Sequence, residues 1–347
     1  MGRVFIGYNN IVGVGIALKK GFQKNQRRSE FFSLEKNLHA FDYLGDEQFI
    51  HLKISRKRFW GYIDFIKLII RQILFYKYFI IIQASETLMP DFRDIKILRF
   101  FRKKTLIIYA GCDVRMPETV EMLKWNSCSG CNTGYKKMVG CEVISKKRKL
   151  RIIEKTFNYI ASPLECSGYI HRQYNSIWFP IDLDYYKVNH RIQREDASIR
   201  ILHAPSNSHI KGTRYINDVM KAITEKYQNV EYILVQNKSK QEVLEIIQSV
   251  DLVIDQMLVG FYGMFAIESM ALGKPVVTYF RPDLWEQVQD FCPVYNANPD
   301  TLYHVLEDIL ADKKSLEVKG KLCRKYVEDY HDCNVVANEI IRIMKIS

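Results

Sequence analysis

The sequence lacks several features by which whole classes of protein are recognised. No uninterrupted run of about 20 apolar residues, the length that crosses a bilayer, is present. The most apolar stretch is Phe59–Gln83, and four charged residues interrupt it: Asp64, Lys67, Arg71 and Lys77. The apolar run Ile11–Leu18 is short and has no small-residue cleavage site after it, and Ile6 stands where myristoylation requires Ser or Thr. We therefore expect a cytosolic chain whose eight cysteines are mostly reduced.

Nucleic-acid-binding signatures are also missing, because no RNP, KH or zinc-finger pattern occurs. The net charge of +12 is nevertheless uneven. Residues 1–190 contain 32 Lys and Arg against 17 Asp and Glu, and the remainder contains 19 against 22. A basic half of this kind indicates a domain that faces a polyanion, either nucleic acid or an anionic membrane. Without a nucleic-acid motif, we expect the membrane.

The stretch Phe59–Gln83 is predicted to form an amphipathic helix over about 61–76 and a buried strand, Phe79–Gln83. Apolar residues interleaved with Lys and Arg are typical of a helix in a membrane interface. Packing on the sheet with the basic face in water is the equal alternative. Three further basic clusters favour the membrane: Arg56–Arg58, Arg102–Lys104 and Lys146–Lys149.

Four cysteines lie within thirty residues, and only one pair has CxxC spacing: Cys112, Cys128, Cys131 and Cys141. Four thiolates can hold a structural zinc ion, but the usual second CxxC is absent. A structural zinc site and buried free cysteines are both left open.

Two further candidates follow predicted strands near the start of the chain. Gly13 and Gly15 follow the strand Val4–Gly7, where they indicate either a nucleotide-binding turn or a tight turn that needs small residues. Asp113 and Arg115 follow the strand Thr105–Ala110, at the end of a strand where open α/β sheets bind ligands. A mutual ion pair of Asp113 and Arg115 is the simpler interpretation.

The second half of the chain alternates predicted strands and helices, which indicates a parallel sheet covered on both faces. Ser239 and Glu242 form a capping box, while Gly273 and Pro275 end a helix. The expected strands are Ile199–His203, Val230–Val235, Leu252–Asp255 and Val276–Tyr279, and a helix is expected over Thr213–Lys226. We predict two doubly wound α/β domains: residues 1–182, with the C-terminal helix 333–347 packed on them, and residues 183–332.

Two segments carry a resemblance to a known family: ILHAPSNSHIKGT and VDLVIDQMLVGFYGMFAIESMALGKPVV, with weaker support from LIIYAGCDVR and WFPIDLDYY. They resemble retaining glycosyltransferases of the GT-B fold, in the broad family 4 group. The resemblance implies two Rossmann-like domains that face a cleft, with the N-terminal one on the acceptor and membrane side. It also implies retention of anomeric configuration by front-face attack. No paired carboxylates typical of glycoside hydrolases are evident.

The resemblance assigns roles to individual residues. Lys211 matches the lysine that binds the donor phosphates, and Glu268 matches the second of two glutamates separated by seven residues, which binds the ribose. Gly260 stands where the first glutamate is expected, so Asp255 or Tyr262 is a candidate to replace it. The other implied site residues are Gly263, Met264 and Phe265 for the diphosphate, Asn207, Arg214, Gly13 and Gly15 on the donor side, and Asp113 and Arg115 on the acceptor side.

The implied function is transfer of a sugar from a UDP- or GDP-linked donor to a lipid-linked or polysaccharide acceptor. The expected setting is synthesis of a bacterial surface glycan, such as lipopolysaccharide, capsule or exopolysaccharide, at the inner face of the cell membrane. No catalytic metal is expected, because Lys211 and a helix dipole can stabilise the leaving diphosphate. Two alternatives remain: a sugar-nucleotide epimerase of the same fold, and an inactive membrane-bound scaffold suggested by Gly260.

Overall fold

The computed structural model describes residues 2–9, 11–33, 50–51, 58–83, 87–129, 131, 141–188 and 198–347. Arg56 and Lys57 of the first predicted basic cluster lie outside these ranges. The chain forms two compact units. Unit 1 comprises Met1–Met116, Thr133–Asp182 and Asp332–Ser347, and unit 2 comprises Pro117–Asn132 and Leu183–His331. Residues 117–132, which the sequence analysis placed in the first domain, therefore cluster with unit 2.

Unit 1 is built on a seven-stranded parallel sheet with the order β3-β2-β1-β4-β5-β6-β7. The strands are β1 (Arg3–Tyr8), β2 (Ser29–Ser33), β3 (Ile50–His51), β4 (Tyr76–Ile82), β5 (Lys104–Ile108), β6 (Tyr159–Ser162) and β7 (Asn175–Ser176). Its central strands are continuous apolar runs, as expected of strands covered on both faces. The winding direction reverses between β1 and β4, which makes their carboxyl ends the switch point of this sheet.

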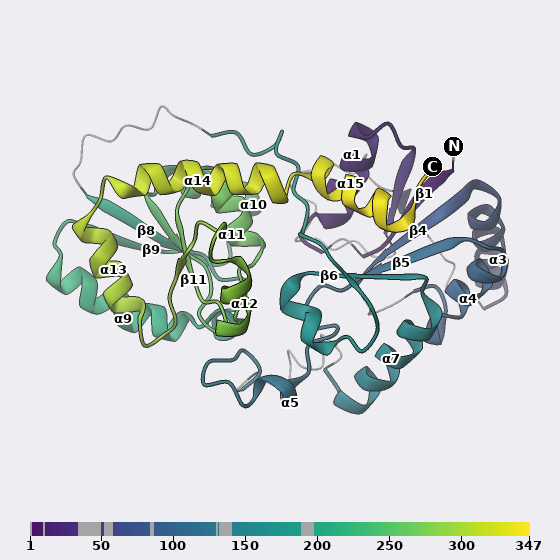
Figure 1. Cartoon of the computed structure of the whole chain (residues 1–347), viewed down its shortest axis with the longest axis horizontal. Helices are drawn as coiled ribbons and strands as arrows, with labels where there is room; N and C mark the ends of the chain where they lie inside the picture. The colour runs from purple at the N-terminus through teal and green to yellow at the C-terminus, as the bar shows by residue number, and fades with distance from the viewer. Residues whose placement is uncertain are drawn as a thin grey trace. The chain divides into compact units, whose positions relative to one another are not determined.

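Helices lie on both faces of the unit 1 sheet, with α1 and α15 above it and α7 below it in Figure 1. They are α1 (Val14–Lys24), α3 (Arg58–Phe75), α4 (Arg93–Phe100), α7 (Val143–Thr156) and α15 (Cys333–Met344), with short 3₁₀ turns η2 (Pro90–Phe92) and η3 (Leu164–Tyr169). The apolar stripe of α15 joins α1 and the sheet in one core. A Cβ at Gly21 would meet the Cys333 carbonyl at 1.9 Å, so the close packing of α1 on α15 requires glycine there.

Unit 2 contains a five-stranded parallel sheet with the order β12-β11-β10-β8-β9. Figure 1 shows α9 and α13 below this sheet and α14 above it. The strands are β8 (Ile199–His203), β9 (Val230–Leu234), β10 (Leu252–Ile254), β11 (Val276–Thr278) and β12 (Tyr295–Asn296). The helices are α5 (Pro117–Val120), α8 (Ser208–Lys211), α9 (Thr213–Lys226), α10 (Lys240–Ser249), α11 (Met264–Ala271), α12 (Pro282–Val288), α13 (Leu302–Ala311) and α14 (Ser315–Tyr330).

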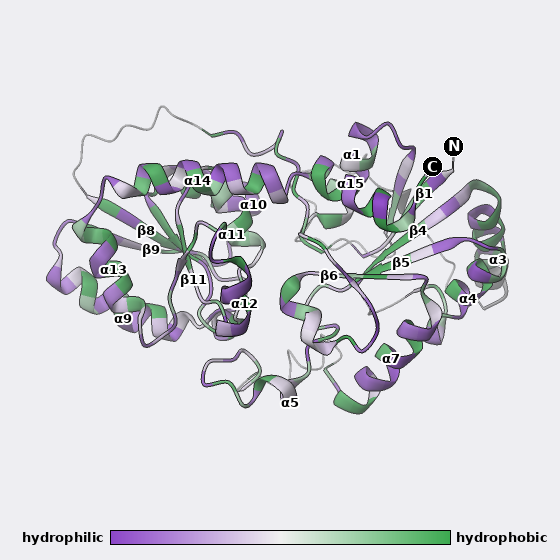
Figure 2. Ribbon diagram, in the orientation of Figure 1, coloured by the Kyte–Doolittle hydropathy of each residue, from purple (hydrophilic) through white to green (hydrophobic). Residues whose placement is uncertain are grey.

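The apolar stripes of α9 and α13 pack against the sheet, and together with the strand residues that face them they form the core of unit 2. In Figure 2 these buried faces are the hydrophobic sides of otherwise mixed helices. The predicted fold class, two doubly wound α/β domains, is confirmed. In the described part of the chain, no helix combines the length and the apolarity that crossing a bilayer requires.

Candidate functional site

The candidate site of unit 2 lies at the switch point of its sheet. The chain winds one way from β8 to β9 and the other way from β8 to β10, so the loops after β8 and β10 stand where open α/β sheets bind ligands. Residues 204–212 and 255–263 form these two loops. The Met257 N–H donates to the Lys211 carbonyl over 2.9 Å, which fastens one loop to the other.

A buried histidine, which the sequence analysis did not single out, supports the base of the site. His203 Nδ1 lies 2.9 Å from the Ile254 carbonyl oxygen, and its Nε2 lies 2.9 Å from Thr213 Oγ1. Because the carbonyl can only accept, Nδ1 carries the proton and Nε2 accepts from the Thr213 hydroxyl. Burial lowers the pKa of His203 to about 4, so the ring is neutral at pH 7. His203 thereby joins β8, β10 and the start of α9.

The loop after β8 is shaped by local capping. Asn207 is the N-cap of α8, and its Oδ1 accepts hydrogen bonds from the N–H groups of His209 and Ile210. Gly212 ends α8 at φ 75°, a left-handed conformation that suits glycine. The predicted donor-side residue Asn207 therefore has a structural role in presenting Lys211.

Lys211 and Asp255 form a nearly buried ion pair between these two loops. Lys211 Nζ lies 2.7 Å from Asp255 Oδ1, with the two side chains 13% and 0% exposed. The other oxygen, Asp255 Oδ2, accepts a 2.7 Å hydrogen bond from the Gly263 N–H. A Cβ at Gly263 would lie 2.9 Å from Lys211 Nζ, so a larger residue there would displace the tip of the lysine. Asp255 thus holds the lysine against the N-terminus of α11.

The N-terminus of α11 presents backbone donors beside that lysine. Gly263 is the N-cap, and Gly263, Met264 and Phe265 are all partly exposed. The first N–H groups of a helix have no partner within the helix, and the helix dipole makes this end positive. A cationic side chain and a helix N-terminus together form a site suited to a phosphate or diphosphate.

Glu268 lies one turn further along α11 and is buried. Its Oε1 accepts a 3.1 Å hydrogen bond from the Tyr186 hydroxyl, and its Oε2 is ion-paired with Lys240, the first residue of α10. Arg324 holds this arrangement by donating to the carbonyls of Tyr186 and Ala271. A carboxylate has about four acceptor positions, and these two partners occupy two of them. Tyr186 and Lys240 were not predicted as site residues.

Gly260 has a structural reason for being glycine. Its φ is 83°, and a Cβ there would meet Arg281 Cγ at 2.3 Å. Arg281 in turn donates to both oxygens of Asp283, at 3.0 and 2.9 Å. The position at which the resemblance expects a glutamate is therefore closed to any side chain in this backbone conformation.

Tyr262 and Arg214, which were also predicted on the donor side, contact other side chains of unit 2. The Tyr262 hydroxyl is buried between the Tyr326 hydroxyl and His331 Nε2, at 2.8 and 2.9 Å, so it faces the interior of unit 2. This arrangement gives no support to Tyr262 as the group that contacts the sugar. Arg214 lies over the Tyr215 ring, with its Cζ 4.8 Å from the ring centroid.

In unit 1, Asp113 and Arg115 each have a further partner in the structure. Both oxygens of the Asp113 carboxylate accept from the Ala110 N–H, at 3.1 and 3.3 Å. Arg115 forms a buried ion pair with Glu165 at 2.8 Å, which ties the loop after β5 to η3. The guanidinium is thus inside unit 1, and a mutual ion pair of Asp113 and Arg115 stays a prediction.

Gly13 and Gly15 also have structural explanations. Gly13 caps α1 at φ 83°, and a Cβ at Gly15 would lie 2.5 Å from the Phe31 ring. The tight turn that the sequence analysis weighed against nucleotide binding is sufficient to explain both glycines. A donor role for them stays a prediction.

The four cysteines for which a structural zinc site was left open are divided between the two units. Cys112 and Cys141 belong to unit 1 and lie 3.4 Å from Arg115 Nη1 and Lys146 Nζ, respectively, while Cys128 and Cys131 belong to unit 2. Over the part of the chain that is described, no three His, Cys, Asp or Glu side chains form a group that could hold a metal ion. None of the eight cysteines forms a disulfide.

Comparisons with known proteins agree with this architecture. No known family model matches the chain. A curated relative, an uncharacterized glycosyltransferase of Methanocaldococcus jannaschii, is 23% identical to this chain over 238 residues. The matched region covers 60% of this chain and 60% of the relative. HepE of Anabaena, solved in complex with UDP and glucose, superposes with a TM-score of 0.68 at 13% identity and full coverage of both chains.

Two further solved structures are similar. Sucrose-phosphate synthase of Thermosynechococcus elongatus has a TM-score of 0.65 at 12% identity, covering 99% of this chain and 98% of its own. A Listeria monocytogenes protein described as a putative UDP-N-acetylglucosamine 2-epimerase has a TM-score of 0.56 at 13% identity, covering 99% of this chain and 95% of its own. At such identities the likeness establishes the fold. The chain has the GT-B architecture of glycosyltransferases.

Proposed function

We propose that the protein is a glycosyltransferase that uses a nucleoside-diphosphate sugar as donor. The observation that carries this proposal is the meeting of Lys211 and the N-terminus of α11 on the Asp255 carboxylate, at the switch point of unit 2. When the bond from the sugar C1 to the diphosphate breaks, negative charge develops on the leaving oxygen. An ammonium and aligned backbone N–H groups stabilise that charge.

The same site suggests the rest of the donor. Glu268 would accept a hydrogen bond from the ribose, while Gly263, Met264 and Phe265 would hold the diphosphate. HepE has been solved with UDP and with UDP-glucose, and this favours a uridine diphosphate sugar over a guanosine one. Because the positive charge comes from Lys211 and the helix, the proposal needs no catalytic metal.

The transfer is proposed to retain the anomeric configuration. The acceptor hydroxyl attacks C1 from the face that the diphosphate leaves, and its proton passes to the departing phosphate oxygen. Asp113 remains a candidate group on the acceptor side. We propose a lipid-linked or polysaccharide acceptor of a bacterial surface glycan as the other substrate.

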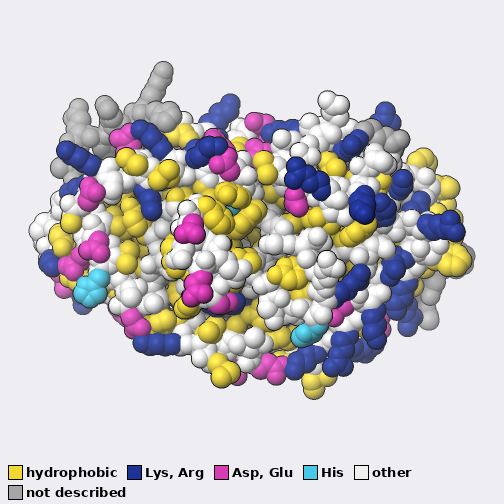
Figure 3. Space-filling view, in the orientation of Figure 1, with side chains coloured by type: hydrophobic (Ala, Val, Ile, Leu, Met, Phe, Trp, Pro, Cys, Tyr) yellow, Lys and Arg dark blue, Asp and Glu magenta, His cyan; other side chains and the backbone are white. Residues whose placement is uncertain are grey.

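An exposed surface on α3 and α4 supports action at an anionic membrane. Ile66, Ile70 and Leu74 follow each other at helical spacing on α3 and are 51%, 50% and 70% exposed. Phe100 at the end of α4 is 82% exposed, and Arg71 lies on α3 between the apolar residues. Figure 3 shows Lys and Arg side chains beside hydrophobic ones at this end of unit 1. Such a surface suits the interface of an anionic bilayer.

Nucleotide binding tests the proposal directly. UDP should raise the midpoint of thermal unfolding, because a ligand that binds only the folded state stabilises it. Lys211→Ala should abolish the shift. Lys226→Ala is the matched control, since Lys226 is an exposed lysine of the same unit that pairs with Glu307. If neither UDP nor GDP shifts the wild-type midpoint, the proposal fails.

The epimerase alternative is kept because of the similarity to the Listeria monocytogenes structure. An epimerase converts one UDP-sugar into another without an acceptor. Incubation of the purified protein with UDP-N-acetylglucosamine or UDP-glucose alone, followed by separation of the products, distinguishes the two. A new UDP-sugar would replace the transferase proposal.

Membrane association is tested with vesicles. Leu74→Ser should weaken binding to phosphatidylglycerol vesicles about 30-fold, since burying a leucine side chain contributes about 2 kcal/mol. Val318→Ser, which changes an exposed apolar residue on α14 of unit 2, should leave binding unchanged. Equal binding of the wild type to neutral vesicles would contradict the anionic preference.

A further inference from the structure

A pocket with polar and cationic side chains lies in unit 1. It has a volume of about 370 Å³, within the range of small-molecule sites. One wall is the loop of residues 87–92, which comes after β4, and the other is the first half of α7. Because β4 flanks the switch point of the unit 1 sheet, the pocket occupies the kind of position where doubly wound domains bind ligands.

The loop wall is held in place from below. The buried Asp94 carboxylate accepts from Thr87 Oγ1 at 2.7 Å and from the Leu88 N–H at 3.1 Å. Phe92 is buried with its ring against Phe157, at a centroid separation of 5.7 Å. Loop residues 87–92 are thus anchored by side chains at both of their ends.

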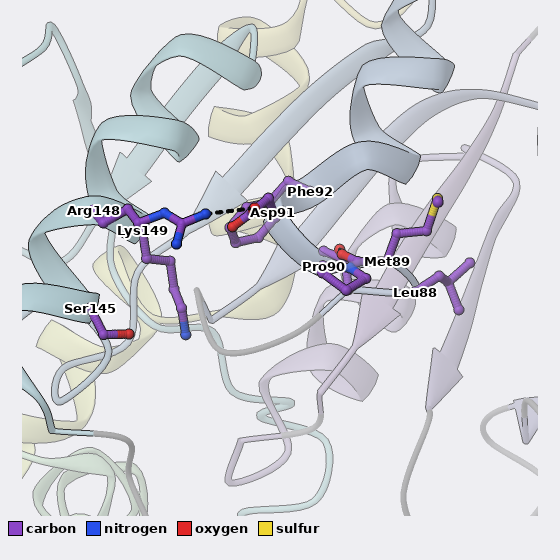
Figure 4. A pocket seen from close by; sticks show the side chains of 9 residues that line it. Leu88, Met89, Pro90, Asp91, Phe92, Ser145, Arg148 and Lys149 are labelled. Atoms are coloured by element: carbon purple, nitrogen blue, oxygen red, sulfur yellow. Dashed lines mark hydrogen bonds and ion pairs between the residues drawn. The ribbon is translucent and has the colours of Figure 1, made fainter.

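The helix wall supplies polar and cationic groups. Figure 4 shows Ser145, Arg148 and Lys149 along the α7 side of the pocket, with the Arg148 guanidinium reaching across to Asp91. Arg148 Nη2 lies 2.9 Å from Asp91 Oδ2, with the two side chains 71% and 38% exposed. Exposed ion pairs of this kind contribute only about 0–1 kcal/mol, so Arg148 can exchange Asp91 for another anion at little cost.

Asp91 itself adopts a left-handed conformation, with φ 55°, and Phe92 follows at φ 54°. A non-glycine residue in this region is uncommon, and two in succession are found where the surrounding structure enforces them. The loop therefore holds the Asp91 carboxylate in front of Arg148. An anionic ligand that enters the pocket would compete with this carboxylate.

The surroundings of the pocket attract anions. Lys147, Arg151 and Lys155 line the next groove along α7, and Figure 3 shows Lys and Arg side chains gathered over this helix. Clustered charge of one sign raises the local concentration of the opposite charge. Arg, Lys and a serine hydroxyl are also the side chains that commonly bind phosphoryl oxygens.

We propose that this pocket binds a phosphoryl group of the acceptor, with Arg148, Lys149 and Ser145 as its ligands and Asp91 as the group that it displaces. The inference rests on the proposed function, because it assigns the acceptor to the class of phosphate or diphosphate esters, such as a lipid diphosphate. It also assigns a binding role to the three residues of α7 that line the pocket, Ser145, Arg148 and Lys149.

The test measures binding of inorganic diphosphate and of farnesyl diphosphate by calorimetry. It uses the full-length Lys211→Ala variant, so that the donor site does not contribute. Binding should fall about tenfold or more in Arg148→Ala and in Lys149→Ala, as expected from loss of a charge-assisted hydrogen bond. Lys147→Ala is the matched control on the same helix, and it should bind as the parent does.

Asp91→Asn separates a ligand site from a structural ion pair. Removal of the competing carboxylate should tighten diphosphate binding several-fold, the opposite of the effect of Arg148→Ala. If the ion pair only stabilises the loop, both variants will lower the unfolding midpoint and neither will change binding selectively. That result would overturn the proposal.

The remaining outcomes also decide the question. Absence of diphosphate binding, or an equal loss in Lys147→Ala, would overturn a built pocket in favour of diffuse positive charge. Binding of phosphatidylglycerol vesicles that requires Arg148, without binding of either diphosphate, would assign the surface to lipid headgroups instead. Protection by UDP is measured separately with intact Lys211, so failure of the donor site is distinguishable from failure of this pocket.

Discussion

The Asp255 carboxylate bridges Lys211 Nζ and the Gly263 N–H, at 2.7 Å to each. In this structure, both positive groups of the proposed diphosphate site are bound to one buried carboxylate. Breaking a buried pair by removing one partner typically costs about 3–5 kcal/mol, whereas replacing both partners with apolar residues is often nearly neutral. The pair is therefore expected to serve ligand binding more than stability.

The first prediction follows from that asymmetry. Asp255→Ala should lower the free energy of unfolding by about 3 kcal/mol or more, because it leaves the Lys211 ammonium nearly buried without its carboxylate. The double variant Lys211→Met, Asp255→Leu should recover much of this loss and still fail to bind UDP. Urea unfolding and UDP titration measure the two effects. A double variant no more stable than Asp255→Ala would show that the pair itself stabilises the fold.

The second prediction concerns Gly260, which stands where the resemblance expects a glutamate. Gly260→Glu should not restore a catalytic carboxylate, because φ is 83° and Arg281 fills the space beside the Cα. Gly260→Ala should destabilise the protein by more than about 1 kcal/mol, the usual penalty for a Cβ in this conformation. Adding Arg281→Ala should relieve the steric part but not the conformational part.

Gly168 provides the control for this series. A Cβ there would meet nothing within 4 Å, so Gly168→Ala should leave the unfolding midpoint nearly unchanged. Equal effects at the two glycines, measured by thermal unfolding, would contradict the role given to Arg281.

Gly260 also shows what the sequence could and could not predict. Gly260 is visible as a missing glutamate, but its positive φ and the overlying Arg281 depend on a residue 21 positions away and on backbone geometry. In contrast, β8 and α9 have the predicted bounds, and the capping box of Ser239 and Glu242 is present. Local chemistry at each boundary carried those predictions.

Elements without such local signals were missed. The short strand β2 has no distinct period, and α7 was seen only as a basic cluster because its apolar positions are few. Within the site, Lys211 and Glu268 could be identified from their neighbours in the sequence. The partners of Glu268 could not, because Tyr186 and Lys240 approach it only through tertiary packing. The direction of the Tyr262 hydroxyl could not be predicted either, because its partner His331 also approaches only through tertiary packing.

The third prediction concerns pH. Burial lowers the pKa of His203 from its ordinary 6.5 to about 4, so between these values the unfolded chain binds a proton that the folded protein does not. Above pH 6.5 the titration of His203 does not reduce the free energy of unfolding. As the pH falls from 6.5 to 4, that free energy decreases progressively. The loss should reach about 3 kcal/mol. Urea unfolding from pH 7 to pH 4.5 measures it.

Substitution identifies the responsible group. His203→Asn should lower stability at pH 7, because Thr213 loses a partner, and should flatten the dependence on pH over this window. The exposed His209, six residues further on, provides the control, since His209→Asn should leave the slope unchanged. An unaltered slope in His203→Asn would assign the acid sensitivity to other groups.

The last prediction asks whether Glu268 contacts the ribose. If its carboxylate accepts from a ribose hydroxyl, the wild type should bind UDP about tenfold more tightly than either 2′-deoxy-UDP or 3′-deoxy-UDP, since a hydrogen bond to a charged group contributes about 1.5–3 kcal/mol. Glu268→Gln should reduce this preference, because a neutral amide oxygen is the weaker acceptor. Glu245→Gln, an exposed glutamate on α10, should preserve it. Titration of the three nucleotides against each variant gives a cycle in which a general loss of stability cancels. Equal loss of affinity for all three nucleotides in Glu268→Gln would leave Glu268 as a positioning residue for Lys240 and Tyr186 rather than a ribose ligand.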